Sequence, residues 1–169
     1  MGGGSTETRR ALDCGAGIGR ITKRLLLPIF KEVDMVELNQ KFLDQAPQFI
    51  GEESSRVKNL FCSGLQDYSP ADGHYNVIWC QWVLGHLRDN DLVKFFQRCK
   101  KGLTENGLIF VKENVTNEER EFDSEDSSYT RTLNDLKILI EKSGLKILEE
   151  KKQKGFPKAI YNVHMFALQ

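Results

Sequence analysis

Residues near the start of the chain have the types and spacing of a nucleotide-binding turn. The segment DCGAGIGR at residues 13–20 carries three glycines at alternate positions, directly after a short apolar run. Glycine suits such a turn because it adopts positive φ freely and has no Cβ to keep a ligand off the backbone. Glu37 follows about 20 residues later, where dinucleotide-binding folds place the acid that binds ribose hydroxyls. The pattern predicts a ligand site at the carboxyl end of the first strand.

The spacing of these glycines distinguishes between classes of nucleotide. Nicotinamide-binding folds use G-x-G-x-x-G, which lets a helix N-terminus meet a pyrophosphate. This chain has G-x-G-x-G after an acid, which is similar to motif I of the S-adenosylmethionine-dependent class I methyltransferases, whose ligand has no phosphate. A purely structural turn is the alternative, but the flanking strand and helix and the position of Glu37 favour a cofactor site. Nicotinamide oxidoreduction is disfavoured by the same spacing.

The composition of the chain excludes several other classes of protein. Its 169 residues are enough for one domain with a core, and 40% hydrophobic with 28% charged residues is ordinary for a globular chain. The formal net charge of +0 provides no overall field to attract nucleic acid or a membrane. The four cysteines are scattered without a C-x-x-C pair, which indicates reduced thiols in an intracellular protein and no metal site. No apolar run is long enough to span a membrane.

Helical and strand patterns alternate along the chain, which predicts an α/β fold with a parallel sheet and helices on both faces. We expect residues 1–10 to be a flexible leader or a truncated N-terminal lid, and residues 11–169 to form one domain. In the helix 40–50, Asn39 is the expected N-cap and Phe42, Leu43, Ala46 and Phe49 are expected to face inward. Residues 114–128 are too polar and irregular to predict an element. The expected strands are 11–13, 33–37, 57–63, 75–80, 108–112, 145–150 and 160–168, the last two as an antiparallel hairpin, and the expected helices are 18–27, 40–50, 91–103 and 129–143.

Further stretches of sequence narrow the assignment to a family. They are WCQWVLGHL at residues 79–87, KEN at 112–114 and DSEDSS at 123–128, together with LDCGAGIGRITK at 12–23. From about Ala11 to Leu168 the chain resembles the eukaryotic protein α-N-terminal methyltransferases. That family methylates the free α-amine of proteins that begin X-Pro-Lys once the initiator Met is gone. The resemblance implies the Rossmann-like, seven-stranded class I methyltransferase sheet with helices on both faces and a C-terminal antiparallel hairpin, and S-adenosylmethionine as the cofactor.

The same resemblance implies which residues contact the cofactor. Arg20 would bind the methionyl carboxylate, because a guanidinium pairs with a carboxylate through two parallel hydrogen bonds. Glu37 would bind the ribose hydroxyls, although the family usually has Asp at this position. The other implied contacts are Gly15 and Gly17 in the turn, Leu38 and Asn39 beside the adenosine, Leu65 and Gln66 at the adenine, and Gln81 near the methionyl part.

The resemblance also implies a binding site for the N-terminal tail of a substrate protein. Trp82 would pack against the proline at the second position, and Asn114 would hydrogen-bond the first residues. Asp123, Asp126 and Ser128 would surround the amine and the lysine at the third position. His86 would lie beside the amine, and Tyr161 would form part of the channel wall.

The chemistry of methyl transfer explains why a carboxylate and an imidazole are expected to be catalytic. An α-amine has a pKa of about 7.7–8.0, so most of it is protonated at pH 7 and has no free lone pair. We expect Asp126 and His86 to act as an acceptor pair that takes the proton and holds the nitrogen in line with the methyl group. Without the resemblance, His86 would be interpreted as a buried, hydrogen-bonded histidine and the acidic run 113–126 as a solvated loop.

The resulting prediction is a protein N-terminal methyltransferase, with two alternatives. The expected partners are the N-terminal tails of X-Pro-Lys proteins, with no direct nucleic acid or membrane contact, and we expect a monomer found in the nucleus and the cytoplasm. One alternative is a class I methyltransferase for a small molecule. The other is a catalytically weak module that binds cofactor or peptide without a lid. In the family, a helical segment before the first strand covers the cofactor, whereas residues 1–10 of this chain are glycine-rich and polar.

Overall fold

The computed structural model describes residues 7–155 and 161–169, and a mixed β-sheet forms its centre. The strands of this sheet are β1 (Arg10–Cys14), β2 (Glu32–Glu37), β3 (Val57–Cys62), β4 (Tyr75–Gln81), β5 (Leu103–Val115), β8 (Ile147–Lys152) and β9 (Asn162–Leu168). A separate hairpin consists of β6 (Glu121–Asp123) and β7 (Ser128–Thr130). The helices are α1 (Gln40–Ile50), α2 (Asp89–Gly102) and α3 (Leu133–Lys142), with the π-helical turn η1 (Thr22–Leu26) and the 3₁₀ turns η2 (Gly51–Arg56) and η3 (Leu84–His86).

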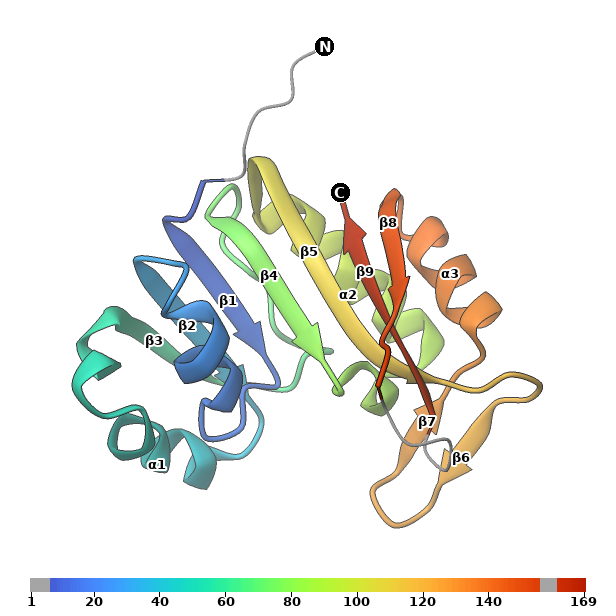
Figure 1. Cartoon of the computed structure of the whole chain (residues 1–169), viewed down its shortest axis with the longest axis horizontal. Helices are drawn as coiled ribbons and strands as arrows, with labels where there is room; N and C mark the ends of the chain where they lie inside the picture. Colours follow the sequence, from blue (N-terminus) through green and yellow to red (C-terminus); the bar gives the residue numbers. More distant parts are fainter. Residues whose placement is uncertain (1–6, 156–160) are drawn as a thin grey trace.

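Within the described residues, the sheet has seven strands in the order β3-β2-β1-β4-β5-β9-β8. Strands β1 to β5 pair in parallel, and β9 runs antiparallel to both of its neighbours, β5 and β8 (Figure 1). The predicted class I methyltransferase sheet and its C-terminal antiparallel strand pair are therefore confirmed. No helix among the described residues is both long and apolar enough to cross a membrane.

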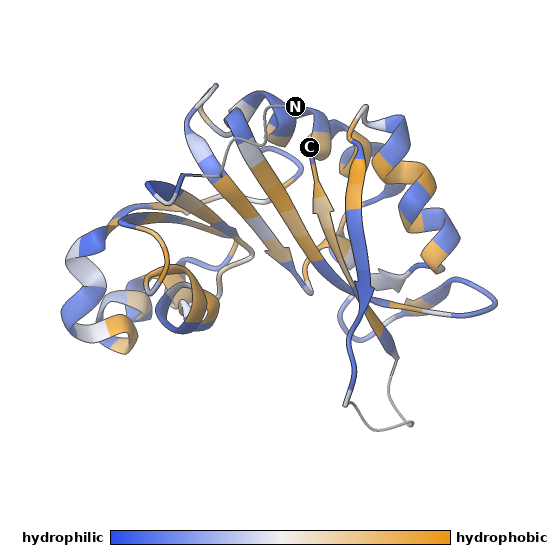
Figure 2. Cartoon of the chain, turned by 45° about the horizontal axis from the view of Figure 1, so that its top comes forward, coloured by the Kyte–Doolittle hydropathy of each residue, from blue (hydrophilic) through white to orange (hydrophobic). Residues whose placement is uncertain are grey.

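Two hydrophobic clusters cover the two faces of this sheet. On one face, α2 and α3 pack buried side chains such as Phe95, Phe96 and Ile140 against the central strands. On the other face, η1 and α1 contribute Leu26 and Leu43 to a smaller cluster over β1 and β2. Figure 1 shows α2 passing behind β5 and β9, and Figure 2 shows that the central strands are hydrophobic along much of their length. Apolar strands buried on both faces are typical of parallel sheets covered by helices.

Several expected elements differ from the observed ones for identifiable physical reasons. The first helix does not begin at Ile18, because Gly19 has a φ of +92°, and regular helical turns start only after it. Phe42 is 43% exposed instead of facing inward; Ile50 takes the buried position at the end of α1. The helix expected to begin at residue 129 begins at Leu133, because residues 128–130 pair as β7.

The segment 114–128, expected to be irregular, is largely ordered into strands. Strand β5 continues through Val115, paired with β9, and the hairpin β6–β7 follows it. At its other end β5 begins at Leu103, directly after α2 ends at Gly102, instead of at the expected residue 108. Because β5 is longer than expected, its last residues, 113–115, extend past the paired end of β4 at the edge of the sheet where the candidate site lies.

The register of the parallel strands places their carboxyl ends at one edge of the sheet. Cys14 at the end of β1 lies opposite both Val36 on β2 and Cys80 on β4. Gly15 and Trp82, which follow β1 and β4, and Glu37, the last residue of β2, therefore come together at this edge. Open α/β sheets bind their ligands at this edge.

Candidate active site

The glycine turn after β1 directs its backbone N–H groups toward β2. Gly15 and Gly17 have φ angles of +69° and +55°, which the turn requires and which L side chains rarely adopt. The N–H groups of Gly15 and Ala16 both donate to the Val36 carbonyl at 2.9 and 3.1 Å, and the Gly17 N–H donates to Glu37 Oε2 at 2.9 Å. These donors are already used within the protein. The turn is therefore suited to a ligand without phosphate groups.

Glu37 is held at the mouth of the site by two backbone donors. Its Oε2 accepts the Gly17 N–H, and its Oε1 accepts the Asn39 N–H, both at 2.9 Å. A carboxylate oxygen has further lone-pair capacity after one such bond. The side chain is therefore fixed in place and still able to accept hydrogen bonds from the hydroxyl groups of a ligand.

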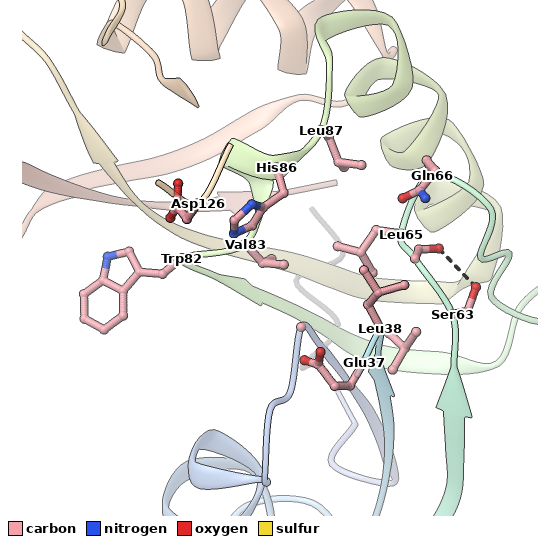
Figure 3. Close-up of a pocket in the computed structure, with 13 residues that line it drawn as sticks. Glu37, Leu38, Ser63, Leu65, Gln66, Trp82, Val83, His86, Leu87 and Asp126 are labelled. Atoms are coloured by element: carbon pink, nitrogen blue, oxygen red, sulfur yellow. Dashed lines mark hydrogen bonds between the residues drawn. The ribbon is translucent and has the colours of Figure 1, made fainter. Parts of the chain in front are cut away.

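A pocket of about 420 Å³ opens beside Glu37 at the carboxyl ends of the strands (Figure 3). This volume lies within the range of about 300–1,000 Å³ found for small-molecule sites. Its walls come from the turns after β1, β2, β3 and β4 and from the loop between β6 and β7. The lining residues are Gly15, Val36, Glu37, Leu38, Ser63, Gly64, Leu65, Gln66, Trp82, Val83, His86, Leu87 and Asp126.

One wall of the pocket is apolar and is anchored to α2. Leu65 is buried, whereas Leu38 is 69% exposed, and both line the pocket. The guanidinium of Arg98 donates to the carbonyls of Leu65, Gln66 and Tyr68 at 2.8, 3.0 and 2.8 Å. Three bonds from one planar guanidinium hold the loop that carries Leu65 in place, so Leu65 offers a fixed apolar surface opposite the exposed Leu38.

Trp82 follows β4 in a backbone conformation that a bulky residue rarely adopts. Its φ is +51°, a conformation that costs on the order of 1–3 kcal/mol and persists only where surrounding contacts impose it. The Trp82 backbone N–H donates to the Lys112 carbonyl at 3.0 Å, and its indole Nε1 donates to Asn114 Oδ1 at 3.1 Å. The Lys112 ammonium lies 5.4 Å from the centre of the ring. The indole is 49% exposed and remains available for contact.

His86 and Asp126 come from different elements and meet at the pocket. Figure 3 shows their side chains next to each other, across the pocket from Glu37 and Leu38. A side-chain hydrogen bond from Ser128 lowers the pKa of Asp126, and a backbone bond from the Ser128 N–H at 3.0 Å and the charge of His86 lower it further. Asp126 is therefore ionised at neutral pH. It can accept a hydrogen bond from a ligand N–H and stabilise a positive charge beside His86.

Comparison with known proteins identifies the family. The family described as "AdoMet dependent proline di-methyltransferase" matches residues 1–169. The chain belongs to this family.

Two curated relatives and one solved structure illustrate the similarity. The chain is 55% identical over 168 residues to N-terminal Xaa-Pro-Lys N-methyltransferase 1 of Danio rerio and 51% identical to the protein of that name from Homo sapiens. In each case the match covers 99% of this chain and 75% of the relative. A SAM-dependent methyltransferase from Leishmania major superposes with a TM-score of 0.93 at 36% identity, over 97% of this chain and 65% of that one.

The pocket fits S-adenosylmethionine, the cofactor of the proline dimethyltransferase family. A Cβ on Gly15 would lie 2.4 Å from Val83 Cγ2, so a larger residue there would displace a pocket wall. Glu37 offers fixed acceptors for the ribose hydroxyls, and Leu38 and Leu65 offer apolar surface for the adenine. Among the described residues, no group of three or more His, Cys, Asp or Glu side chains could hold a metal ion.

Four of the expected cofactor residues do not line the pocket. Asn39 caps α1, since its Oδ1 accepts the Lys41 N–H at 3.0 Å, and Gln81 Oε1 accepts the Trp79 Nε1–H at 3.1 Å. Gly17 supports the site through its bond to Glu37, and Arg20 is exposed. The contacts of all the expected residues with the cofactor, inside and outside the pocket, stay predictions.

The expected substrate residues divide in a similar way. Trp82, His86 and Asp126 line the pocket, whereas Asn114 and Ser128 lie one hydrogen bond behind Trp82 and Asp126. Asp123 and Tyr161 are exposed and do not line the pocket. Asp123 Oδ1 accepts the Glu125 N–H at 2.8 Å, and the Tyr161 hydroxyl donates to Glu121. The roles of all these residues in binding a substrate or in catalysis also stay predictions.

Glu113 supports this site, although it was given no role of its own from the sequence and, without the resemblance, would be interpreted as part of a solvated loop. It is 8% exposed, and its Oε1 accepts the N–H groups of Val83 and Leu84 at 2.8 and 2.9 Å. Burial raises the pKa of Glu113 to about 7, against the lowering effect of these two bonds. Glu113 lies on β5 in phase with Val111 and Val115, which are both buried. An acid in the buried phase of a strand was the signal that could have identified it.

Asp13 is a second buried acid, on the opposite side of the site. It is 2% exposed, and its Oδ2 accepts the Thr22 N–H and hydroxyl at 3.0 and 2.6 Å. Burial raises the pKa of Asp13 to about 6. Through its two hydrogen bonds from Thr22, Asp13 fixes the start of η1 relative to the glycine turn.

Proposed function

We propose that this chain transfers a methyl group from S-adenosylmethionine to the free α-amine of proteins that begin X-Pro-Lys. The single observation that carries the proposal is one pocket that joins two kinds of wall. Glu37, Leu38 and Leu65 suit a nucleoside, and Trp82, His86 and Asp126 suit an amine that is followed by proline. The similarity to the Danio rerio and Homo sapiens proteins, whose printed names specify Xaa-Pro-Lys, supports this choice of substrate.

The residues on the cofactor side hold and orient the bound group. Glu37 accepts the ribose hydroxyls, Leu38 and Leu65 enclose the adenine, and Arg20 pairs with the methionyl carboxylate. When it is bound, S-adenosylmethionine supplies an electrophilic methyl group on its sulfonium. The protein orients this group toward the amine and excludes water from the space between them.

His86 and Asp126 prepare the amine for attack. The substrate arrives mostly as an ammonium, because an α-amine has a pKa of about 7.7–8.0. A proton passes from the ammonium nitrogen to the imidazole of His86, which leaves a lone pair on the nitrogen. The Asp126 carboxylate accepts one remaining N–H and stabilises the imidazolium that forms. Because Asp126 alone would stabilise the ammonium and raise its pKa, the imidazole is needed as the proton acceptor.

The substrate tail is read by Trp82 and by acidic side chains. The exposed indole offers a rigid apolar face to a proline ring, and Asn114 holds this indole through its Oδ1. Asp123 and Asp126 supply negative charge for the lysine at the third position, while Ser128 and Tyr161 border the channel. We further infer a monomer that acts in the nucleus and the cytoplasm without direct contact with nucleic acid.

Mass spectrometry of a Ser-Pro-Lys peptide incubated with the chain and S-adenosylmethionine tests this function. We expect a mass gain in steps of one methyl group, which is lost when the α-amine of the peptide is acetylated. A Ser-Ala-Lys peptide is the matched control for the proline requirement. Methylation of the acetylated peptide, or no methylation of any peptide, would contradict the proposal. In the second case, calorimetric binding of S-adenosylhomocysteine would favour a binding module without turnover.

A further inference from the structure

The turn that carries Trp82 and His86 is hydrogen-bonded by two buried side chains, an acid that accepts from it and a guanidinium that donates to it. Glu113 Oε1 accepts the Val83 and Leu84 N–H groups at 2.8 and 2.9 Å. The guanidinium of Arg131 donates to the carbonyls of Leu84 and Leu87. Glu113 is 8% exposed and Arg131 is 4% exposed. Charged groups this deeply buried are retained only where they are well hydrogen-bonded.

The turn, residues 82–87, has few hydrogen bonds of its own. Its internal bonds are His86 N–H to the Val83 carbonyl at 3.3 Å and Leu87 N–H to the Leu84 carbonyl at 3.2 Å, both long for backbone bonds. It also contains Trp82 at a φ of +51°. A short turn with long internal bonds and a left-handed tryptophan depends for its shape on contacts with other segments. The Trp82 N–H bond to the Lys112 carbonyl and the burial of Leu84 and Leu87 supply part of this support, and the bonds with Glu113 and Arg131 supply the rest.

The same turn contacts both halves of the pocket. Val83 packs so closely over Gly15 that a Cβ there would lie 2.4 Å from Val83 Cγ2. A Cβ on Gly85 would lie 2.8 Å from the Tyr129 carbonyl on β7. The turn is thus packed between the cofactor turn and the hairpin whose connecting loop carries Asp126. A small displacement of the turn would move Trp82 and His86 relative to both.

We propose that Glu113 and Arg131 are positioning residues, which hold the turn 82–87 so that Trp82 and His86 face the same pocket as Asp126. The catalytic consequence rests on the proposed function, whereas the position of the turn rests on the contacts above. Arg131 also donates to Asp89 Oδ1 at 3.0 Å at the start of α2. A lysine has three donors on a single nitrogen, whereas the planar guanidinium reaches these three acceptors from three separate nitrogens, so a lysine would not preserve all of the bonds.

The proposal is tested with tryptophan fluorescence and kinetics together. The chain has two tryptophans, so Trp79→Phe leaves Trp82 as the reporter of the turn. In this background, we expect Glu113→Ala to increase acrylamide quenching of Trp82 and to shift its emission to the red. We expect kcat/KM for the Ser-Pro-Lys peptide to fall on the order of 10²-fold, as a displacement of about 1 Å can cause. The Kd of S-adenosylhomocysteine should change much less than kcat/KM, because only Val83 of the turn packs against the cofactor side, whereas Glu37 and Leu65 lie on other segments.

Conservative variants show whether the change in Trp82 emission and in kcat/KM comes from lost hydrogen bonds or from a general loss of stability. Glu113→Gln retains an acceptor oxygen for the two N–H groups, so it should restore the emission and most of kcat/KM. Arg131→Lys should loosen the turn in the same way as Glu113→Ala. Val111→Ala is the matched control, because Val111 is 1% exposed in the same phase of β5 and its apolar side chain offers no hydrogen bond to the turn. It should lower the melting temperature and leave the emission of Trp82 unchanged.

The possible outcomes separate this proposal from the function it rests on. Unchanged Trp82 emission in Glu113→Ala, or an equal change in Val111→Ala, would overturn the positioning role. If the parent chain fails to methylate the peptide while Trp82 responds as expected, the proposed function is wrong and the positioning of the turn stands. If the peptide is methylated and Glu113→Ala has the kcat/KM of the parent, the positioning role is overturned and the function stands.

Discussion

The two halves of the pocket are built in different ways. On the cofactor side, the glycine turn follows β1 and Glu37 ends the adjacent parallel strand β2, and the two are joined by hydrogen bonds from backbone N–H groups. On the substrate side, Trp82, His86 and Asp126 lie on a turn and a hairpin loop, held by side chains from β5 and from the residues after β7. The first half follows from strand register, whereas the second depends on side-chain contacts between distant segments. Substitutions on the two sides should therefore separate cofactor binding from turnover.

The largest separation is expected for Asp126→Asn. The amide cannot carry the negative charge that stabilises the protonated His86, so kcat should fall by about 10²–10⁴-fold, the range for a lost acid–base group. The Kd of S-adenosylhomocysteine, measured by calorimetry, should stay within about threefold because the cofactor wall is unchanged. Ser128→Ala, which removes only the supporting hydroxyl, should have a smaller effect. An equal loss of binding and turnover would refute the assignment of Asp126 to the substrate side.

The buried acids Glu113, on the substrate side, and Asp13, on the cofactor side, provide a second comparison, through the pH dependence of stability. Glu113 has a folded-state pKa of about 7 and Asp13 one of about 6, both raised from ordinary values mainly by burial. The folded state therefore binds these protons more tightly than the unfolded state does. The stabilisation of the folded state by proton binding to these two acids is complete below their unfolded-state pKa values. It is lost as the pH rises through their folded-state values. The free energy of unfolding should fall between about pH 4 and 7 on account of these two groups.

Urea denaturation at pH 5 and pH 8 measures this loss. Glu113 alone accounts for up to about 3 kcal/mol of the fall in the free energy of unfolding, since each unit of pKa shift corresponds to about 1.4 kcal/mol. Glu113→Gln should remove most of that contribution and leave the part due to Asp13, which titrates in the lower part of the range. A loss of the same size in the parent and in Glu113→Gln would show that Glu113 does not titrate in this range.

On the cofactor side, Glu37→Gln should weaken binding and spare the chemical step. The loss of a charged acceptor for a hydroxyl costs about 1.5–3 kcal/mol, so the Kd of S-adenosylhomocysteine should rise roughly ten- to a hundredfold. At saturating cofactor, kcat should change little. Glu37→Asp, the residue usual in the family, is the matched control and should retain most of the affinity. A fall in kcat without a change in Kd would show that Glu37 acts in turnover and not in cofactor binding.

The smallest effect is expected for Arg20→Lys. A lysine keeps the charge but loses the planar pair of hydrogen bonds to a carboxylate, so the Kd of S-adenosylhomocysteine should rise about fivefold. Because Arg20 is exposed, water screens part of this contact. Arg24→Lys, at an exposed position in η1, serves as the control for a general change of charge distribution. An unchanged Kd in Arg20→Lys would refute the contact with the methionyl carboxylate.

The expectations from sequence were most successful where the pattern is local. The strand before the glycine turn, the strand ending at Glu37 and the cap at Asn39 all lie where the sequence predicted them. The prediction that Phe42 faces inward was wrong. Helical periodicity indicates how wide the buried face of a helix is, but it does not fix which residue lies at the centre of that face. The hairpin β6–β7 was missed because its residues are mostly exposed and polar, so no alternation of hydrophobic residues marks it.

The sequence by itself determined the class of sheet, the cofactor turn and the family, because these depend on glycine spacing, strand periodicity and contiguous motifs. Only the tertiary structure decided how the substrate side is assembled. Glu113 and Arg131 lie about 30 and 47 residues from the turn they hold, and no local pattern connects such distant partners. It also decided that Trp82 adopts a positive φ, because a left-handed tryptophan is imposed by surrounding contacts and not by its own preference.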